Sequence, residues 1–190
     1  LPTDTYLTDI FSEKGAEFIR WHQDEPWFLY LAYNAPHGPI MAPREKLDNY
    51  AHIDDYKRRG LAAMMDSLDD GIGHVLQTLE ATGQLENTVV WFLSDNGAVA
   101  VDSHAWNGSR NDPFSGDKGD VFEGGIRVPF IVSWPGTIPG GRTLSEPVIS
   151  LDILPTSLAL AGVEQVPAIH EGKNLLPWLE GKAPCPDREL

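Results

Sequence analysis

The stretch "TVVWFLSDNGA", residues 88–98, joins a run of β-branched and aromatic residues to an acid, an amide and a glycine. The run predicts a strand that ends near Leu93. Asp95 and Asn96 then have two interpretations. The commoner role of an Asn-Gly pair is to supply the positive φ angles of a tight hairpin turn. Alternatively, a carboxylate and an amide oxygen that follow a buried strand are ligands for a hard cation, at the edge where α/β sheets hold their active sites.

Two long segments before this stretch carry apolar residues at helical spacing. The first covers residues 3–22, with Thr3 or Asp4 as its expected cap. The second covers residues 54–82 and is expected to end at Gly83, because glycine readily adopts the left-handed conformation that terminates a helix. Its apolar stripe comprises Leu61, Met65, Leu68, Ile72, Val75, Leu76 and Leu79. Both segments are therefore predicted to be amphipathic helices.

Two further apolar runs predict strands. "PWFLYLAYN", residues 26–34, is continuously apolar and aromatic, as expected of a strand that is buried on both faces. "RVPFIVSWPG", residues 127–136, predicts the strand that follows the Asp-Asn stretch. Strands that alternate with helices and long connections predict an α/β fold, with a mostly parallel sheet flanked by helices on both faces.

The C-terminal part has a different composition. Residues 150–162 predict a helix that begins at Ser150 and is interrupted by Pro155. Residues 166–190 are rich in proline and glycine and are expected to run over the surface.

Composition excludes several classes of protein. The 190 residues are 42% apolar, which is enough for a hydrophobic core. Fourteen basic and 28 acidic residues give a net charge of -14, which argues against non-specific binding to nucleic acid or to an anionic membrane. No apolar run reaches the roughly 18 to 20 residues of a membrane span. The single cysteine, Cys185, leaves no disulfide and no cysteine-based zinc site within the chain.

Three loops carry candidate chemistry. His37 follows the apolar run at residues 26–34, in "NAPHGP". Asp95 and Asn96 follow the apolar run at residues 88–93, and Lys118 lies in the glycine-rich "SGDKGDVFEGG". Taken singly, these residues are a surface histidine, a turn and a solvated lysine. Taken together, a hard-cation pair, a histidine and a lysine on loops that adjoin strands predict an active site for an oxyanion.

Four blocks of the sequence resemble a known family. They are "PWFLYLAYNAPHGPIMAP", the segment from "LAAMMDSLDDG" to "FLSDNGA", "GDKGDVFEGGIRVPFIVSWPG" and "SLDILPTSLALAG". In order and spacing they resemble the second half of the catalytic domain of type I sulfatases, members of the alkaline phosphatase superfamily. The resemblance implies an alkaline-phosphatase-like fold that is incomplete in this chain. Residues 1–165 would belong to the catalytic domain, and the tail at 166–190 would lead toward a C-terminal subdomain.

The resemblance also implies roles for individual residues, and it favours the metal-ligand interpretation of the Asp-Asn pair. Asp95 and Asn96 would hold a divalent cation, normally calcium in this family, through the oxygens that calcium prefers. His37 would lie near the sulfate and protonate the bridging oxygen of the ester. Lys118 would bind the sulfate as a compact point charge. His104 is a further candidate for contact with the organic part of the substrate.

Other polar residues near these motifs are interpreted as structural. Glu123 and Arg127 are expected to pair with each other rather than contact substrate. Asp69 and Asp70 in "LDDG" lie within the long predicted helix and are expected to be solvated or structural.

The nucleophile of these sulfatases is a formylglycine made from the cysteine or serine of a C-x-P-S-R motif, and the 190 residues contain no such motif. Cys185 in "CPDR" lacks the proline and serine of the motif. The parent protein is therefore expected to be a sulfuric ester hydrolase that acts on a sulfated small molecule or carbohydrate, and this chain alone is expected to be inactive. The alternatives are a phosphatase, phosphodiesterase or phosphonate hydrolase of the same superfamily, or a non-catalytic metal-binding fragment. By family resemblance the compartment would be periplasmic, extracellular or lysosomal.

Overall fold

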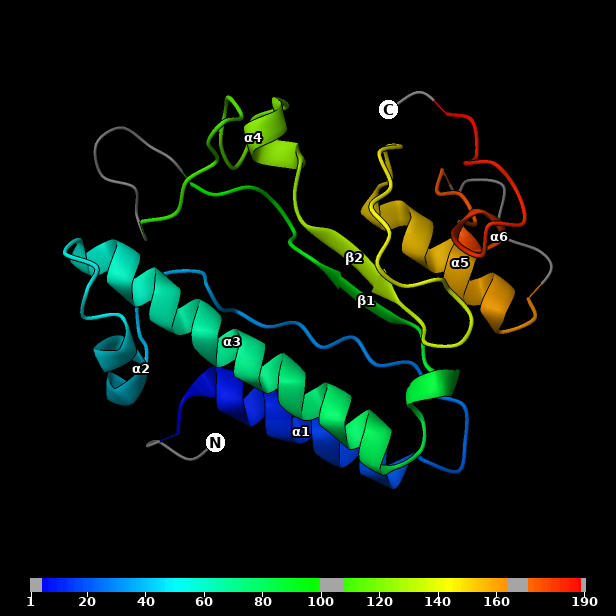
Figure 1. Cartoon of the computed structure of the whole chain (residues 1–190), viewed down its shortest axis with the longest axis horizontal. Coiled ribbons are helices and arrows are strands. Elements are labelled where there is room, and N and C mark those ends of the chain that lie inside the picture. Colours follow the sequence, from blue (N-terminus) through cyan, green and yellow to red (C-terminus); the bar gives the residue numbers. More distant parts are fainter. Residues whose placement is uncertain (1–4, 100–107, 164–170, 189–190) are drawn as a thin grey trace. The chain divides into compact units, whose positions relative to one another are not determined.

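The computed structural model describes residues 5–99, 108–163 and 171–188 (Figure 1). The chain divides into two compact units. Unit 1 comprises Leu1–Leu85 and Phe92–Phe130, and unit 2 comprises Glu86–Trp91 and Ile131–Leu190. The division that the sequence predicted, between residues 165 and 166, falls outside the described ranges and stays a prediction.

Two parallel helices, α1 (Leu7–Trp21) and α3 (Tyr56–Ala81), pack against each other in unit 1 (Figure 1). Small residues allow their close approach, because a Cβ atom on Gly71 would lie 2.1 Å from the Ser12 hydroxyl oxygen. That hydroxyl donates to the Thr8 carbonyl oxygen at 2.8 Å and lies 2.9 Å from the Tyr33 hydroxyl. The two long predicted helices are confirmed.

The end of α3 agrees with the sequence. Gly83 has φ of 72°, and its N–H donates to the Glu80 carbonyl, while Gln84 N–H donates to the Leu79 carbonyl. This is the left-handed termination that the glycine predicted. At the other end, the Asp55 carboxylate accepts hydrogen bonds from the Lys57 and Arg58 amides at 2.9 and 3.0 Å.

The start of α1 and the stripe of α3 differ from the predictions. The proposed caps, Thr3 and Asp4, lie outside the described residues, and the N-cap of α1 is Tyr6, with no side-chain capping bond. Met65 is 42% exposed, whereas its neighbour Met64 is 2% exposed. Met64 packs with Ala35 and with other residues of the segment after α1, so the core of unit 1 selects a face slightly rotated from the predicted stripe.

Residues 26–34 run extended, but they are not assigned as a strand and are not buried on both faces. Exposure alternates along the segment, and Phe28 and Tyr30 are 70% and 81% exposed. The opposite face contacts α1 and α3, for example where Phe11 meets Tyr33 edge to face at 6.3 Å between ring centroids. The prediction was wrong here because, among the described residues, no element packs over the face that carries Phe28 and Tyr30. The short helix α2 (Arg44–Asn49) follows it and contacts α3.

The described residues form one two-stranded sheet, from β1 (Val90–Leu93) and β2 (Phe130–Ser133) (Figure 1). The strands run antiparallel, since Ser94 N–H donates to the Pro129 carbonyl and Gly97 N–H donates to the Gly125 carbonyl. The α/β class is consistent with this mixture of helices and sheet. The mostly parallel arrangement is not found in this pair.

Unit 2 contains the 3-10 helix η2 (Ser150–Asp152), α5 (Ile153–Leu160) and α6 (Leu176–Leu179). Pro155 lies in the first turn of α5, where a missing N–H costs no helical hydrogen bond, so it does not interrupt the helix. The tail does not simply run over the surface. Leu175, Trp178 and Leu179 are buried and pack with Trp91, Val132, Ile138, Leu144, Val148 and Cys185.

Another 3-10 helix, η1 (Leu85–Asn87), precedes β1. Within the described ranges, no helix is both long enough and apolar enough to cross a membrane.

Candidate functional site

The loop after β1 is not a hairpin turn. β1 pairs with β2, which comes much later in the chain, and Gly97 does not have a positive φ. Instead, the Ser94 hydroxyl donates to the Asn96 carbonyl at 2.9 Å, and Gly97 N–H donates to the Gly125 carbonyl at 2.9 Å. The turn interpretation of the Asn-Gly pair is therefore wrong, and the loop passes directly into the neighbourhood of the lysine loop.

Asp95 is exposed and Asn96 is half-buried on this loop. A carboxylate and an amide oxygen fit a hard cation such as calcium, which takes about six to eight oxygen ligands. Two side chains supply only part of such a set. Across the described ranges, no group of three or more His, Cys, Asp or Glu side chains is placed to hold a metal ion. The assignment of Asp95 and Asn96 as ligands stays a prediction that agrees with their chemistry.

The lysine loop is joined to the Asp-Asn loop through the main chain. Lys118 N–H donates to the Ala98 carbonyl at 3.0 Å, while the Lys118 side chain is exposed. Gly116 and Gly119 flank this residue with φ of 85° and 100°, a backbone conformation that L side chains rarely adopt. The structure thus brings the loop of Lys118 to the loop of Asp95 and Asn96, which lie far apart in the sequence.

One side chain that the sequence reasoning missed reinforces this junction. Asn111 Oδ1 accepts from Ala98 N–H at 2.8 Å, and its Nδ2 donates to the carbonyls of Ala98 and Gly116 at 2.9 and 3.0 Å. The only local signal was an asparagine close to a proline in "NDPF", which usually indicates a turn. The hydrogen bonds to another loop could not be foreseen from it.

Glycines pack the third segment of the site, α4 (Glu123–Ile126), against the other two. Gly124 N–H donates to the Ser115 carbonyl at 2.7 Å. A Cβ atom on Gly97 would lie 1.8 Å from the Gly124 carbonyl oxygen, and one on Gly124 would lie 2.1 Å from the Gly116 oxygen. The "EGG" sequence is therefore required by the contact of three main-chain segments.

Glu123 and Arg127 pair with each other at 3.0 Å, as predicted. The Arg127 guanidinium also lies over the Phe114 ring, 4.8 Å from its centroid. Both side chains of the ion pair are mostly exposed, so the pair contributes little to stability. Asp69 and Asp70 are exposed on α3, and Asp70 pairs with Lys46, which confirms their structural interpretation.

His37 lies on its own loop, which is anchored on α3. Its N–H donates to the Asn34 carbonyl at 2.8 Å, and its Nδ1 lies 2.8 Å from the Gly38 carbonyl oxygen. Ala35, two residues earlier, packs on Met64 and Leu68. Because a carbonyl can only accept, Nδ1 carries a hydrogen and Nε2 is the nitrogen that can exchange a proton. The role of His37 near substrate stays a prediction, and His104 lies outside the described residues.

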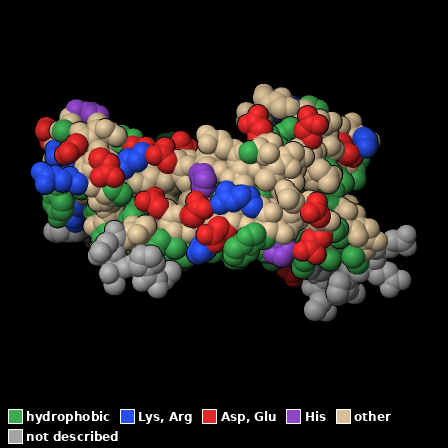
Figure 2. All heavy atoms as spheres, turned by 90° about the horizontal axis from the view of Figure 1, so that it is seen from below, with side chains coloured by type: hydrophobic (Ala, Val, Ile, Leu, Met, Phe, Trp, Pro, Cys, Tyr) green, Lys and Arg blue, Asp and Glu red, His purple; other side chains and the backbone are tan. Residues whose placement is uncertain are grey.

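Figure 2 shows Asp and Glu side chains scattered over the face drawn there, with few Lys and Arg side chains among them. That distribution agrees with the net charge of -14. The lysine loop itself carries two carboxylates, those of Asp117 and Asp120, and the Asp120 carboxylate accepts from Asp117 N–H at 3.0 Å. An anionic substrate would therefore meet local positive charge from Lys118 within an acidic surface.

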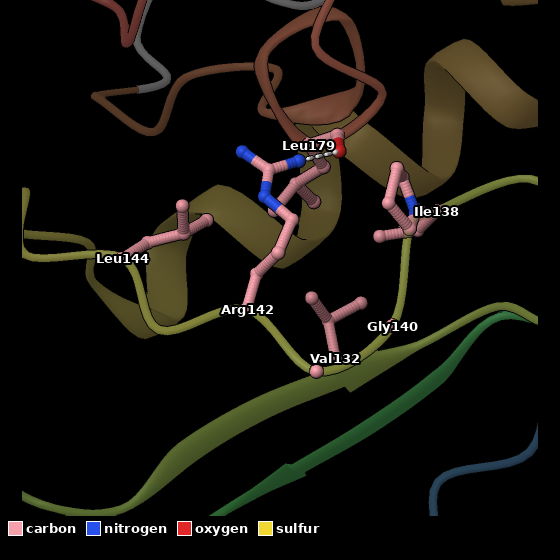
Figure 3. A pocket seen from close by; sticks show the side chains of 8 residues that line it. Val132, Ile138, Gly140, Arg142, Leu144 and Leu179 are labelled. Carbon is pink, nitrogen blue, oxygen red and sulfur yellow. Dashed lines mark hydrogen bonds between the residues drawn. The ribbon is translucent and has the colours of Figure 1, made fainter.

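A cavity lies in unit 2, and its lining includes none of the predicted site residues. Its volume is about 80 Å³, and Arg142 beside it donates to the Leu179 carbonyl at 3.1 Å (Figure 3). The cavity is lined by Val132, Ile138, Pro139, Gly140, Gly141, Arg142, Leu144 and Leu179.

Cys185, also in unit 2, has its thiol pKa raised by desolvation. The raised pKa disfavours the reactive thiolate, which agrees with the conclusion from sequence that Cys185 is not the nucleophile.

Comparison with known proteins tests the resemblance directly. The family model described as Sulfatase matches residues 2–163. The chain belongs to the sulfatase family. It is 35% identical over 178 residues to N-acetylgalactosamine-6-sulfatase of Canis lupus familiaris, covering 92% of this chain. It is 33% identical over 195 residues to steryl-sulfatase of Rattus norvegicus, covering 100% of this chain. The chain spans 33% of the length of each of these sulfatases.

The fold is that of solved sulfatases. Ps i-CgsB, solved in complex with k-i-k-neocarrahexaose, superposes with a TM-score of 0.88 and 34% sequence identity. The match covers 96% of this chain and 40% of that chain. These matches support an alkaline-phosphatase-like fold, of which this chain spans a part.

Proposed function

We propose that the full-length protein hydrolyses sulfate monoesters, using a calcium ion held in part by Asp95 and Asn96 and a formylglycine nucleophile. The observation that carries the proposal is the hydrogen bond from Lys118 N–H to the Ala98 carbonyl, 3.0 Å long. It joins a loop with two hard-cation ligands to a loop with an exposed ammonium group. Hydrolysis of a sulfate ester is favoured by positive charge beside the sulfuryl oxygens, which a bound cation and the lysine ammonium group would both supply.

Each of these residues has a chemical role in the proposal. The Asp95 carboxylate and the Asn96 side-chain oxygen hold the cation, which supplies positive charge to the sulfate when bound. Lys118 Nζ binds a sulfuryl oxygen and neutralises charge that develops during reaction. His37 Nε2 gives a proton to the bridging oxygen as the alcohol departs, while its Nδ1–H stays on the Gly38 carbonyl, 2.8 Å away.

The substrate class is a sulfated carbohydrate or another sulfated small molecule. The relatives named above act, by their names, on the 6-sulfate of N-acetylgalactosamine and on steryl sulfates, and Ps i-CgsB binds a carbohydrate. These names support the sulfate ester as the shared group. They differ in the alcohol, so the alcohol is left open in the proposal.

The test is a hydrolysis assay on the full-length protein. Release of 4-nitrophenol from 4-nitrophenyl sulfate is measured with and without EDTA, together with the matching phosphate and phenylphosphonate esters. We expect the sulfate ester to be preferred, EDTA to inhibit, and Lys118→Ala to lower kcat/KM by about 100-fold or more. Lys182→Ala removes an exposed lysine that pairs with Glu180 in unit 2, and is expected to leave kcat/KM unchanged.

Two outcomes would refute the proposal. Preference for the phosphate or phosphonate ester would assign the protein to another reaction of the superfamily. Hydrolysis of none of the three esters, with calcium binding retained, would identify a non-catalytic metal-binding protein.

A further inference from the structure

Asn111 makes three hydrogen bonds that tie two loops of the candidate site together. Its Oδ1 accepts from Ala98 N–H at 2.8 Å, and its Nδ2 donates to Ala98 O at 2.9 Å and to Gly116 O at 3.0 Å. The orientation of the amide is unambiguous, because the Ala98 N–H needs an acceptor and the two carbonyls need donors. Both main-chain groups of Ala98 are thus bound by one half-buried side chain.

The bound groups lie next to the residues of the proposed chemistry. Ala98 is two residues after Asn96, and Gly116 is two residues before Lys118. The Ala98 carbonyl also accepts from Lys118 N–H at 3.0 Å, so it is shared between Asn111 and the lysine itself. A movement of Asn111 would therefore shift the main chain that carries Lys118 relative to the loop of Asp95 and Asn96.

The lysine loop is fixed mainly by polar contacts, which include the hydrogen bond from Gly124 N–H to the Ser115 carbonyl at 2.7 Å. Lys118, Gly119 and Asp120 are exposed, so few apolar contacts restrain the loop. Gly116 and Gly119 have positive φ. Because glycine adopts many backbone conformations, the loop would be flexible without the hydrogen bonds of Asn111. Polar contacts from a neighbouring side chain are an effective way to hold such a loop in one geometry.

We propose that Asn111 is a positioning residue, which sets the location of Lys118 relative to the cation ligands Asp95 and Asn96. This inference rests on the proposed function, because it assigns Asn111 an effect on catalysis through Lys118. Asn111 itself does not contact the reacting atoms in this proposal.

The test is a double-mutant cycle in the full-length protein. Asn111→Ala is expected to lower kcat/KM for 4-nitrophenyl sulfate by about 10- to 100-fold, as is usual for residues that orient functional groups. In a Lys118→Ala background the same substitution should cost no more than about twofold, because the group that it positions is gone. Asn111→Asp keeps the size and the acceptor for Ala98 N–H but loses both donors, and it should resemble Asn111→Ala.

A matched control comes from Asn174 in unit 2, whose Oδ1 accepts from Leu176 N–H at 3.0 Å. Asn174→Ala also removes an asparagine that binds the main chain, and we expect kcat/KM to stay within about twofold of the unsubstituted protein. Thermal unfolding of every variant shows whether a loss of activity follows only from a loss of folded protein.

Hydrogen exchange supplies a second readout that needs no substrate. Asn111→Ala should speed exchange of the Ala98 and Lys118 amides by about tenfold. The Ala98 amide loses its acceptor, Asn111 Oδ1, and the acceptor of the Lys118 amide, the Ala98 carbonyl, is no longer held in place. Asn174→Ala should leave both amides unchanged. This readout separates the two proposals: if the unsubstituted protein hydrolyses no sulfate ester, the proposed function fails, and exchange at the two amides still decides whether Asn111 positions the lysine loop.

Two results would overturn the inference. In the first, Asn111→Ala and Lys118→Ala lower kcat/KM independently, so that their effects multiply in the double variant. In the second, Asn111→Ala leaves both kcat/KM and the exchange of the two amides unchanged.

Discussion

Asp152 and Arg188 form a buried ion pair in unit 2, 2.9 Å apart, with side chains 0% and 6% exposed. The Asp152 carboxylate also accepts from the Lys173 and Ile149 amides at 2.8 and 2.9 Å. One aspartate thereby holds the start of η2, the segment before α6 and the end of the described chain. Among the described residues, two of the guanidinium nitrogens of Arg188, Nε and Nη2, have no hydrogen-bond partner, so its charge depends strongly on Asp152.

We predict that Asp152→Ala lowers the free energy of unfolding by about 3 to 5 kcal/mol, because it leaves a buried guanidinium without its counter-charge. Urea unfolding of the full-length protein measures this change. Asp187→Ala removes an exposed aspartate next to Arg188 and should change the free energy by less than about 0.5 kcal/mol. A loss below about 1 kcal/mol for Asp152→Ala would contradict the idea that Arg188 depends on this carboxylate.

At the level of elements, the packing of α1 on α3 depends on where glycine stands in α3. A Cβ atom on Gly71 would meet the Ser12 hydroxyl oxygen at 2.1 Å, whereas one on Gly73 would meet nothing within 4 Å. The two positions share a helix and a residue type. They differ in whether another helix covers them.

We predict opposite effects of the same substitution at these positions. Gly71→Ala should destabilise the protein by about 1 to 3 kcal/mol through overpacking. Gly73→Ala should stabilise it by about 0.5 to 1 kcal/mol, because alanine loses less conformational entropy in a helix. Thermal unfolding of the two variants tests both signs, and equal effects would argue against the helix contact as the cause.

A second contact between elements joins α2 to α3 and depends on pH. Lys46 Nζ lies 2.8 Å from Asp66 Oδ1, and the two side chains are 19% and 20% exposed. The hydrogen bond from Lys46 lowers the pKa of Asp66 below its ordinary value of 3.8. The Asp66 carboxylate therefore takes up a proton at a higher pH in the unfolded chain than in the folded one. The contribution to stability is therefore present above the ordinary value and is lost as pH falls through the folded pKa.

We predict that Lys46→Met lowers the free energy of unfolding by about 0.5 to 1 kcal/mol at neutral pH. The difference from the unsubstituted protein should shrink as the pH falls below 3.8, the ordinary pKa of Asp66. Urea unfolding at a series of pH values measures it. Lys14→Met, which removes a lysine that is 64% exposed, serves as the control. A difference that stays constant into acid would exclude the ion pair as its source.

At the scale of the whole molecule, metal binding would be linked to stability. If Asp95 and Asn96 hold calcium in the full-length protein, the folded state binds the ion and the unfolded state does not. A free calcium concentration 100 times the Kd would then add about 2.7 kcal/mol of stability. The family's fold and the chemistry of the pair support this expectation, and the described residues supply only part of the ligand set.

We predict that EDTA lowers the Tm of the full-length protein and that calcium restores it. Asp95→Ala should lower the Tm in calcium and abolish most of the response to EDTA. Asp69→Ala, at an exposed position of α3 that is not expected to bind the ion, should keep the full response. An equal response of both variants would remove Asp95 from the metal site.

Local sequence determined much of the secondary structure. The two long helices, the left-handed termination at Gly83 and the strands that became β1 and β2 all followed from side-chain period and from the conformational freedom of glycine. These features depend on residues within a few positions of one another, and the same is true of the Glu123–Arg127 pair. The family could also be recognised from sequence, because several motifs stand in the right order and spacing.

Tertiary structure decided the features that depend on distant partners. An Asn-Gly pair is compatible with a hairpin, and the pairing of β1 with β2 and the φ angle of Gly97 excluded one. Met64 rather than Met65 is buried, and Leu175 in the proline-rich tail belongs to a core, because residues far away in the chain cover them. The contacts of Asn111 could not be predicted for the same reason. Its side chain binds the main chain of Ala98 and Gly116, and a hydrogen bond to another loop produces no pattern in the sequence.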